Sequence, residues 1–205
     1  MGWHNYLRSV RAGARRSVAF YSSANKPYRE RWVVRSFLRN LGVKFHAFQV
    51  QSERNEPPDV RYLAAAFEIK EIMDPGRRRH DEYRVFLQRA NSASSPNDLL
   101  EFHDPRDISL SEVLDLVWSV AEELGKKYPA ATRKSLDLLA YINLKHVLGI
   151  KADVVPVMQS WRRFGFRSIS FLKGSQTSYV AFADHTAPVF LHGRVGELVH
   201  FDHAT

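Results

Sequence analysis

The stretch PDVRYLAAAFEIK, residues 58–70, decides the fold, because it predicts two short strands joined by a tight turn. Residues two apart on a β-strand point to the same face, so Glu68 and Lys70 share one face and the apolar residues beside them point into a core. Asp59 follows the turn signal Asn-Glu-Pro-Pro and opens the neighbouring strand. If the strands pair, Asp59 lies near Glu68, and carboxylates held together repel one another unless a divalent cation binds.

The length and charge of the chain narrow the class of protein. A chain of 205 residues with 44% hydrophobic residues predicts a single domain, residues 1–205, with a substantial core. The formal net charge of +8 favours a polyanionic partner, either nucleic acid or an anionic surface. A protein that is basic without such a partner is the alternative, and net charge alone does not separate the two.

The composition also excludes several kinds of site. The chain has no Cys, which excludes disulfides, thiolate metal sites and a thiol nucleophile. No apolar run approaches the roughly 20 residues that a membrane span requires, and the first residues lack the apolar segment of a secretory signal. We therefore expect a cytoplasmic protein with no membrane partner.

The segments before residue 58 predict two helices and a strand. Residues 3–20 suit an amphipathic helix whose basic face either touches phosphates or is simply solvated. Residues 27–40 predict a helix with Glu30 on its apolar stripe, where a carboxylate is costly unless it is paired or binds a ligand. A salt bridge, or a favourable position in the first turn of the helix, is an equal alternative for Glu30. Residues 43–50 alternate in the way typical of a strand.

Two basic segments are candidates for nucleic-acid contacts. Arg77, Arg78 and Arg79 follow a turn directly after the predicted strand, and arginine forks fit phosphate oxygens. A solvated loop is an equal alternative for this segment. Arg162 and Arg163 are interleaved with aromatic residues, a composition that can stack bases while it holds phosphates. Core aromatics with exposed arginines are the commoner outcome for such a segment.

The second half of the chain predicts helices followed by strands. Ser109 and Glu112 form a capping box at the start of a helix over residues 109–125, and a further apolar stripe predicts a helix over 132–149. Together they make a helical insertion of about residues 109–149. A β-rich part, about residues 153–203, follows, with short strands expected at residues 154–158, 167–172, 179–183, 189–191 and 198–201.

A helix bearing Glu30, then a strand, then Pro58-Asp59, then Glu68-Ile69-Lys70 resembles the PD-(D/E)xK nuclease superfamily, which includes restriction endonucleases and Holliday-junction resolvases. More narrowly, the sequence is similar to a small bacterial family described as endonucleases of unknown function. The resemblance covers about residues 26–73. It implies an α/β (α+β) fold with a restriction-endonuclease-like core, in which helices flank a mixed central sheet. The remaining helices and the C-terminal β-meander would be additions to that core.

The resemblance also implies a chemistry. Mg²⁺, with Mn²⁺ as a substitute, would be held by Asp59, Glu68 and the Ile69 carbonyl, while Lys70 holds the attacking water and Glu30 completes the site. We therefore expect a metal-dependent endonuclease that hydrolyses phosphodiester bonds of DNA, and many enzymes of this type act as homodimers. The main alternative is a nucleic-acid-binding or assembly module on the same fold, whose acidic and basic residues form structural ion pairs. A basic protein-interaction domain is the weaker third reading.

Overall fold

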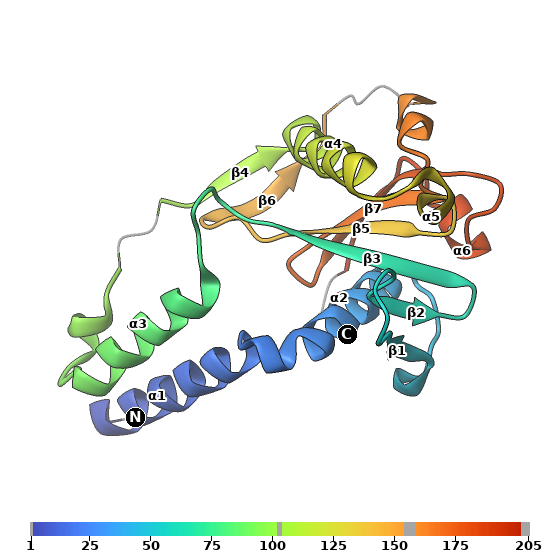
Figure 1. Ribbon diagram of the computed structural model, residues 1–205. Helices are drawn as coiled ribbons and strands as arrows, with labels where there is room; N and C mark the ends of the chain where they lie inside the picture. Colours follow the sequence, from blue (N-terminus) through green and yellow to red (C-terminus); the bar gives the residue numbers. More distant parts are fainter. Residues whose placement is uncertain (1, 102–103, 154–158, 202–205) are drawn as a thin grey trace. The chain divides into compact units, whose positions relative to one another are not determined.

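A mixed β-sheet organises most of the chain in the computed structural model, which describes residues 2–101, 104–153 and 159–201 (Figure 1). Within these residues the sheet has seven strands, in the order β1-β2-β3-β5-β7-β8-β9. Neighbours pair antiparallel except for β3 with β5 and β5 with β7, which are parallel. The strands are β1 (Val50–Ser52), β2 (Val60–Tyr62), β3 (Ala65–Ile72), β5 (Asp137–Ile142), β7 (Ser168–Lys173), β8 (Thr177–Ala183) and β9 (Leu198–His200).

The chain divides into two compact units. Unit 1 is Met1–Arg29 with Pro75–Asp104, and unit 2 is Glu30–Asp74 with Pro105–Thr205. Unit 2 contains the sheet. It also contains a separate parallel pair, β4 (Arg106–Ser109) and β6 (Val147–Lys151). The expectation of a single domain stays a prediction, because compactness does not test whether the units fold independently.

Strand β3 lies inside the sheet, and its side chains point alternately to the two faces of the sheet, where they join two different hydrophobic cores. Phe67 and Ile69 join a cluster with Val34 and Phe37 of α2 (Lys26–Asn40). Ala66 and Ile72 of β3 join the cluster on the opposite face of the sheet. The even-numbered positions therefore put Glu68 and Lys70 on the second face, as the spacing predicts.

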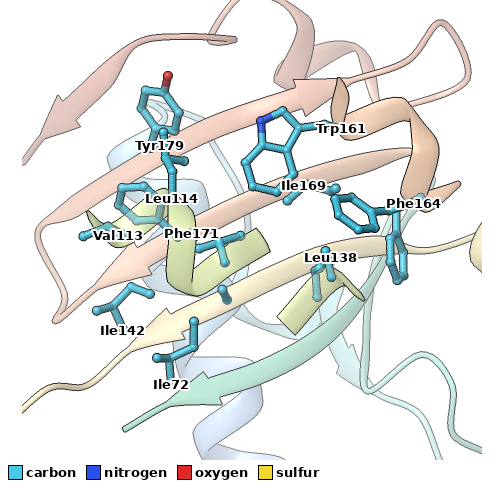
Figure 2. Close-up of a cluster of buried hydrophobic side chains, with 14 of the residues drawn as sticks. Ile72, Val113, Leu114, Leu138, Ile142, Trp161, Phe164, Ile169, Phe171 and Tyr179 are labelled. Atoms are coloured by element: carbon cyan, nitrogen blue, oxygen red, sulfur yellow. The ribbon is translucent and has the colours of Figure 1, made fainter. Parts of the chain in front are cut away.

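The second core lies under α4 (Leu110–Lys127), and Figure 2 shows its side chains between the helix and the sheet. Val113, Leu114 and Val117 are almost completely buried there. The predicted capping box is confirmed: the Glu112 backbone N–H donates to Ser109 Oγ at 3.1 Å, and the Ser109 N–H donates to the Glu112 carboxylate at 2.9 Å. These bonds satisfy N–H groups that would otherwise lack partners at the first turn.

Unit 1 consists of α1 (Trp3–Phe20), packed against α3 (Arg79–Ser92), and short 3₁₀ turns at Ser23–Asn25 and Pro96–Leu99. Leu7 and Ala14 of α1 are buried, as is Ala90 of α3. Arg11 donates to the Ala90 carbonyl at 2.8 Å and to the Ala93 carbonyl at 2.9 Å. A cation at this position satisfies the last carbonyls of α3 and interacts favourably with the helix dipole.

The prediction of a helix over residues 132–149 is wrong. A single turn, α5 (Ala130–Arg133), is followed by β5 and then β6. Strand β5 lies between β3 and β7, both parallel to it, and its residues face apolar clusters on both sides. A strand buried on both faces is a continuous apolar run, and periodicity alone does not distinguish such a run from a buried helix.

Two of the predicted strands are also wrong. Residues 43–50 form irregular backbone and a 3₁₀ turn at Ala47–Gln49 before β1, where the His46 N–H donates to Gln49 Oε1 at 2.7 Å. Residues 189–191 lie in α6 (Val189–His192), which follows Pro188, and proline favours the start of a helix. Residues 154–158 lie outside the described residues. The antiparallel run β7-β8-β9 confirms the C-terminal meander.

Candidate active site

Asp59 is fixed to β3 by its main chain and by its side chain. It precedes β2, whose first residue Val60 pairs with Phe67. The Asp59 N–H donates to the Phe67 carbonyl at 3.0 Å, and Asp59 Oδ2 accepts the Ile69 N–H at 2.7 Å. Asp59 is 4% exposed. Its carboxylate therefore sits beside the segment of β3 that carries Glu68 and Lys70.

Glu68 is the most enclosed acidic group of the site, with 2% of its surface exposed. Its Oε1 accepts a hydrogen bond from the Tyr128 hydroxyl at 2.8 Å and lies 3.1 Å from Lys70 Nζ. Burial raises the pKa of Glu68 above its ordinary value, and the negative charge of Asp59 raises it further. The two contacts favour the ionised form, but burial is the larger effect.

A second group of carboxylates surrounds Asp59. One oxygen from each of Glu30, Glu56 and Asp59 lies within 4.8 Å of the others. Glu30 comes from α2, whereas Glu56 comes from the loop before β2. Burial and the carboxylate of Glu68 raise the pKa of Tyr128, and the charges of Asp59 and Glu56 add smaller effects in the same direction. Glu56, Asp59 and Glu68 therefore all act electrostatically on the Tyr128 hydroxyl, and Glu30 lies next to the first two.

The four predicted catalytic residues, Glu30, Asp59, Glu68 and Lys70, all belong to unit 2. Glu30 and Asp59 belong to the group of three carboxylates, whereas Glu68 lies outside that group and pairs with Lys70. Sequence reasoning missed Glu56, although it lies in the turn signal three residues before Asp59. It also missed Tyr128, which follows α4 directly. No local pattern indicates that the end of this helix meets β3.

Asp137 is a buried carboxylate with a different role. It is fully buried, and its oxygens accept the Ala66 N–H at 2.8 Å and the Ser168 hydroxyl at 2.9 Å. Arg167 forms an ion pair with it at 2.5 Å. Burial raises the pKa of Asp137. Because these donors occupy both oxygens, Asp137 links β3, β5 and β7 rather than presenting a ligand.

The arginines predicted as a phosphate clamp belong to unit 1, whereas the acidic site belongs to unit 2. Arg77 pairs with Glu82 at 2.9 Å. The Arg79 guanidinium lies over the Tyr21 ring, 4.2 Å from its centroid, and Arg79 is only 9% exposed. Arg78 is exposed. The internal contacts of Arg77 and Arg79 favour a structural role for these two, while a nucleic-acid role for the segment stays a prediction.

The aromatic residues around Arg162 and Arg163 are part of the core. Trp161, Phe164 and Phe166 are at most 5% exposed, so they have no free ring face on which a base could stack. This confirms the alternative of core aromatics with exposed arginines for this segment. The Arg163 guanidinium lies 5.5 Å from the centroid of the Trp118 ring. Both arginines are exposed, and their contact with nucleic acid stays a prediction.

Comparisons with known proteins give a family and one similar structure. Within the residues that the structure describes, no helix is long and apolar enough to cross a membrane. No curated protein matches the sequence. A solved structure of a protein of unknown function from Pseudomonas aeruginosa strain PAO1, described as belonging to the monooxygenase superfamily, is 26% identical with a TM-score of 0.66. The match covers 98% of this chain and 97% of that one.

The family described as "Putative endonuclease, protein of unknown function (DUF1780)" matches residues 3–205. This match spans both compact units and includes every residue of the acidic site. The chain therefore belongs to that family.

Proposed function

We propose that the protein is a metal-dependent endonuclease that hydrolyses phosphodiester bonds of DNA at a site of the PD-(D/E)xK type. The observation that carries the proposal is the convergence of Glu30, Glu56 and Asp59 within 4.8 Å, beside the Glu68–Lys70 pair. The family description and the net charge of +8 support a nucleic-acid substrate.

The residues of the site fit a hard divalent cation such as Mg²⁺, for which Mn²⁺ can substitute. Hard cations prefer oxygen ligands, and carboxylates this close together repel one another until a cation binds. Glu30, Glu56 and Asp59, which form the group of three, would hold the ion. Glu68, which lies outside that group and pairs with Lys70, would join the shell directly or through water. The Ile69 carbonyl is a further candidate, because the N–H and C=O of a strand residue point to the same side and the Ile69 N–H donates to Asp59.

A bound Mg²⁺ would polarise the phosphate and make a bound water more acidic. Lys70 is placed to assist at the same point. Its ammonium lies 3.1 Å from Glu68, and its side chain is 34% exposed, so it remains accessible to a phosphate oxygen or to the attacking water. A cation fixed there stabilises the negative charge that develops in the transition state. Tyr128 is a positioning residue, because it holds Glu68 through a 2.8 Å hydrogen bond.

We favour hydrolysis over the chemistry named for the P. aeruginosa protein because of the residues gathered here. The group of three contains only carboxylates, which suit Mg²⁺ or Mn²⁺, whereas oxygen-activating non-haem iron sites combine two histidines with a carboxylate. The Glu68–Lys70 ion pair keeps the second candidate open, a binding module without turnover. A homodimer stays a prediction.

Incubation of the protein with plasmid and with oligonucleotide duplexes, in Mg²⁺, Mn²⁺ or EDTA, tests the proposal. We expect cleavage that requires metal and that is lost in Lys70→Ala and in Asp59→Asn. Lys126→Ala is a matched control, because Lys126 is an exposed lysine of α4 whose side chain is 78% exposed. Cleavage that continues unchanged in both site variants refutes the assignment. Salt-sensitive DNA binding without any cleavage supports the second candidate.

A further inference from the structure

The positive charge of the protein is concentrated in unit 1. This unit has eleven Lys and Arg residues against five Asp and Glu residues, so it contributes +6 of the net charge of +8. The segment Met1–Arg29 contains six of these cations and no acidic residue. Such a distribution is the electrostatic footprint of a surface that binds a polyanion.

Unit 1 also contains a hollow of about 440 Å³, within the range of roughly 300–1,000 Å³ of sites that hold small ligands. The lining residues come from α1, the residue after it and α3, namely Gly13, Arg16, Ser17, Phe20, Tyr21 and Tyr83. The Tyr21 and Tyr83 rings stack with centroids 4.6 Å apart and planes 5° apart. Tyr83 covers one face of the Tyr21 ring and the Arg79 guanidinium covers the other, so Phe20 and Tyr83 are the rings left for a base. An aromatic ring next to a cation is the combination that binds a base and its phosphate.

The charges near these rings suit an anion. Arg16 lines the hollow and is exposed. Arg79 is only 9% exposed and its guanidinium lies over the Tyr21 ring, 4.2 Å from the centroid. Arg29 donates to the Phe20 and Ser22 carbonyls at 2.7 Å, so Arg16 is the cation that the hollow presents to a ligand. Burial, followed by the neighbouring Tyr21, raises the pKa of Tyr83 to about 12, so this phenol stays neutral and does not repel a phosphate.

Gly13 leaves one part of the hollow without a side chain. It lies in the middle of α1, where glycine is unfavourable compared with alanine. Nothing in its backbone conformation requires glycine, because its φ is not positive. An added Cβ would meet only Arg16 Nη2, at 3.9 Å, so a larger side chain at this position would extend into open space. Glycine therefore keeps this part of the hollow open at a cost to the helix.

We propose that this hollow is a binding site for an unpaired nucleotide of single-stranded DNA, with the base against Phe20 and Tyr83 and the phosphate on Arg16. Bases in a duplex are stacked and paired, so only an unpaired base can enter a pocket of this kind. The proposal extends the proposed function, because it names single-stranded or frayed DNA as the substrate class. Binding at this site needs neither metal nor cleavage.

The test is fluorescence anisotropy of the full chain with a dye-labelled single-stranded oligodeoxynucleotide and with a duplex of the same sequence, both in EDTA. We expect tighter binding of the single strand. Gly13→Leu, which fills the hollow, and Arg16→Ala should each weaken single-strand binding tenfold or more and duplex binding much less. Arg15→Ala is the matched control, because the neighbouring Arg15 carries the same charge on α1 but does not line the hollow.

Gly13→Ala controls for the fold, because alanine favours the helix and fits beside Arg16. Circular dichroism should show that all the variants keep their helix content. Single-strand binding that is unchanged in Gly13→Leu overturns the proposal, as does an equal loss in Arg15→Ala and Arg16→Ala, which would indicate general electrostatics alone. Equal affinity for both DNA forms overturns it too. Cleavage assays are separate, so failure of the nuclease assignment is distinguishable from failure of this site.

Discussion

Replacing Asp59 with asparagine is expected to stabilise the metal-free protein. Oxygens of Glu30, Glu56 and Asp59 lie within 4.8 Å of one another. Two unit charges at that distance repel by about 0.9 kcal/mol even at the dielectric constant of water, and by more in the less polar surroundings of a protein. Asp59→Asn removes two such pairs, or about 2 kcal/mol of repulsion by the same estimate. The amide oxygen can still accept the Ile69 N–H, which now lies 2.7 Å from Asp59 Oδ2.

Thermal denaturation in EDTA measures the gain in stability of Asp59→Asn over the wild type. For a protein of this size, about 2 kcal/mol corresponds to a rise in Tm of roughly 4–8 °C. Saturating Mg²⁺ should reverse the order, because a ligand at a hundredfold excess over its Kd stabilises the native state by about 2.7 kcal/mol. We expect that gain in the wild type and little of it in Asp59→Asn. The crossing of the two stabilities is the signature of carboxylates that are arranged for a cation.

Asp115→Asn is the matched control, because Asp115 is an exposed carboxylate on α4. In EDTA, this substitution should change the free energy of unfolding by no more than about 0.5 kcal/mol, and Mg²⁺ should stabilise the variant as much as it stabilises the wild type. An Asp59→Asn protein that is less stable than the wild type in EDTA refutes the repulsion argument. Equal stabilisation of both proteins by Mg²⁺ refutes the metal site.

Three further predictions concern the neighbouring residues. Lys70→Ala should lower the cleavage rate by about 10²–10³-fold, the usual cost of losing one fixed stabilising group, while DNA affinity in EDTA changes little. The raised pKa of Glu68 means that the folded state binds its proton more tightly than the unfolded state does. The free energy of unfolding of the metal-free wild type, relative to that of Glu68→Gln, should therefore fall as the pH rises from 4.5 through the pKa of Glu68 in the folded state. Tyr128→Phe removes the hydrogen bond that the Tyr128 hydroxyl donates to the ionised Glu68, so it should shift this fall to higher pH. Asp137→Ala leaves Arg167 without its buried partner and should cost about 3–5 kcal/mol in urea denaturation; a loss below 1 kcal/mol would contradict a linking role.

The parts of the site that the sequence predicts are those that local periodicity controls. The two-residue period of β3 places Glu68 and Lys70 on one face, and the pair is found 3.1 Å apart. The short turn between β2 and β3 brings Asp59 to the same segment. Neither inference needs information from distant parts of the chain.

The parts that the sequence does not predict depend on distant packing. Glu56 joins the site because its loop meets Glu30 of α2, and Tyr128 joins it because the end of α4 meets β3. Strand β5 was missed because both of its faces are buried, so its sequence lacks the alternation of a half-exposed strand. The turn at Asp74-Pro75-Gly76 can be predicted from the sequence. Its place as the boundary between the two compact units cannot, because that depends on the contact between α3 and α1.

The uneven charge of the chain explains why binding and cleavage should respond to different conditions. The acidic site contains four carboxylates and one ammonium, that of Lys70, which pairs with Glu68, so without a bound cation it repels a phosphate. Unit 2 as a whole carries only +2 of the net charge, which leaves most of the attraction for DNA to unit 1. Affinity should then fall steeply with salt and be indifferent to EDTA, whereas cleavage should depend on metal at any salt concentration that permits binding. Affinity that requires Mg²⁺ would instead mean that the acidic site itself holds the nucleic acid through the metal.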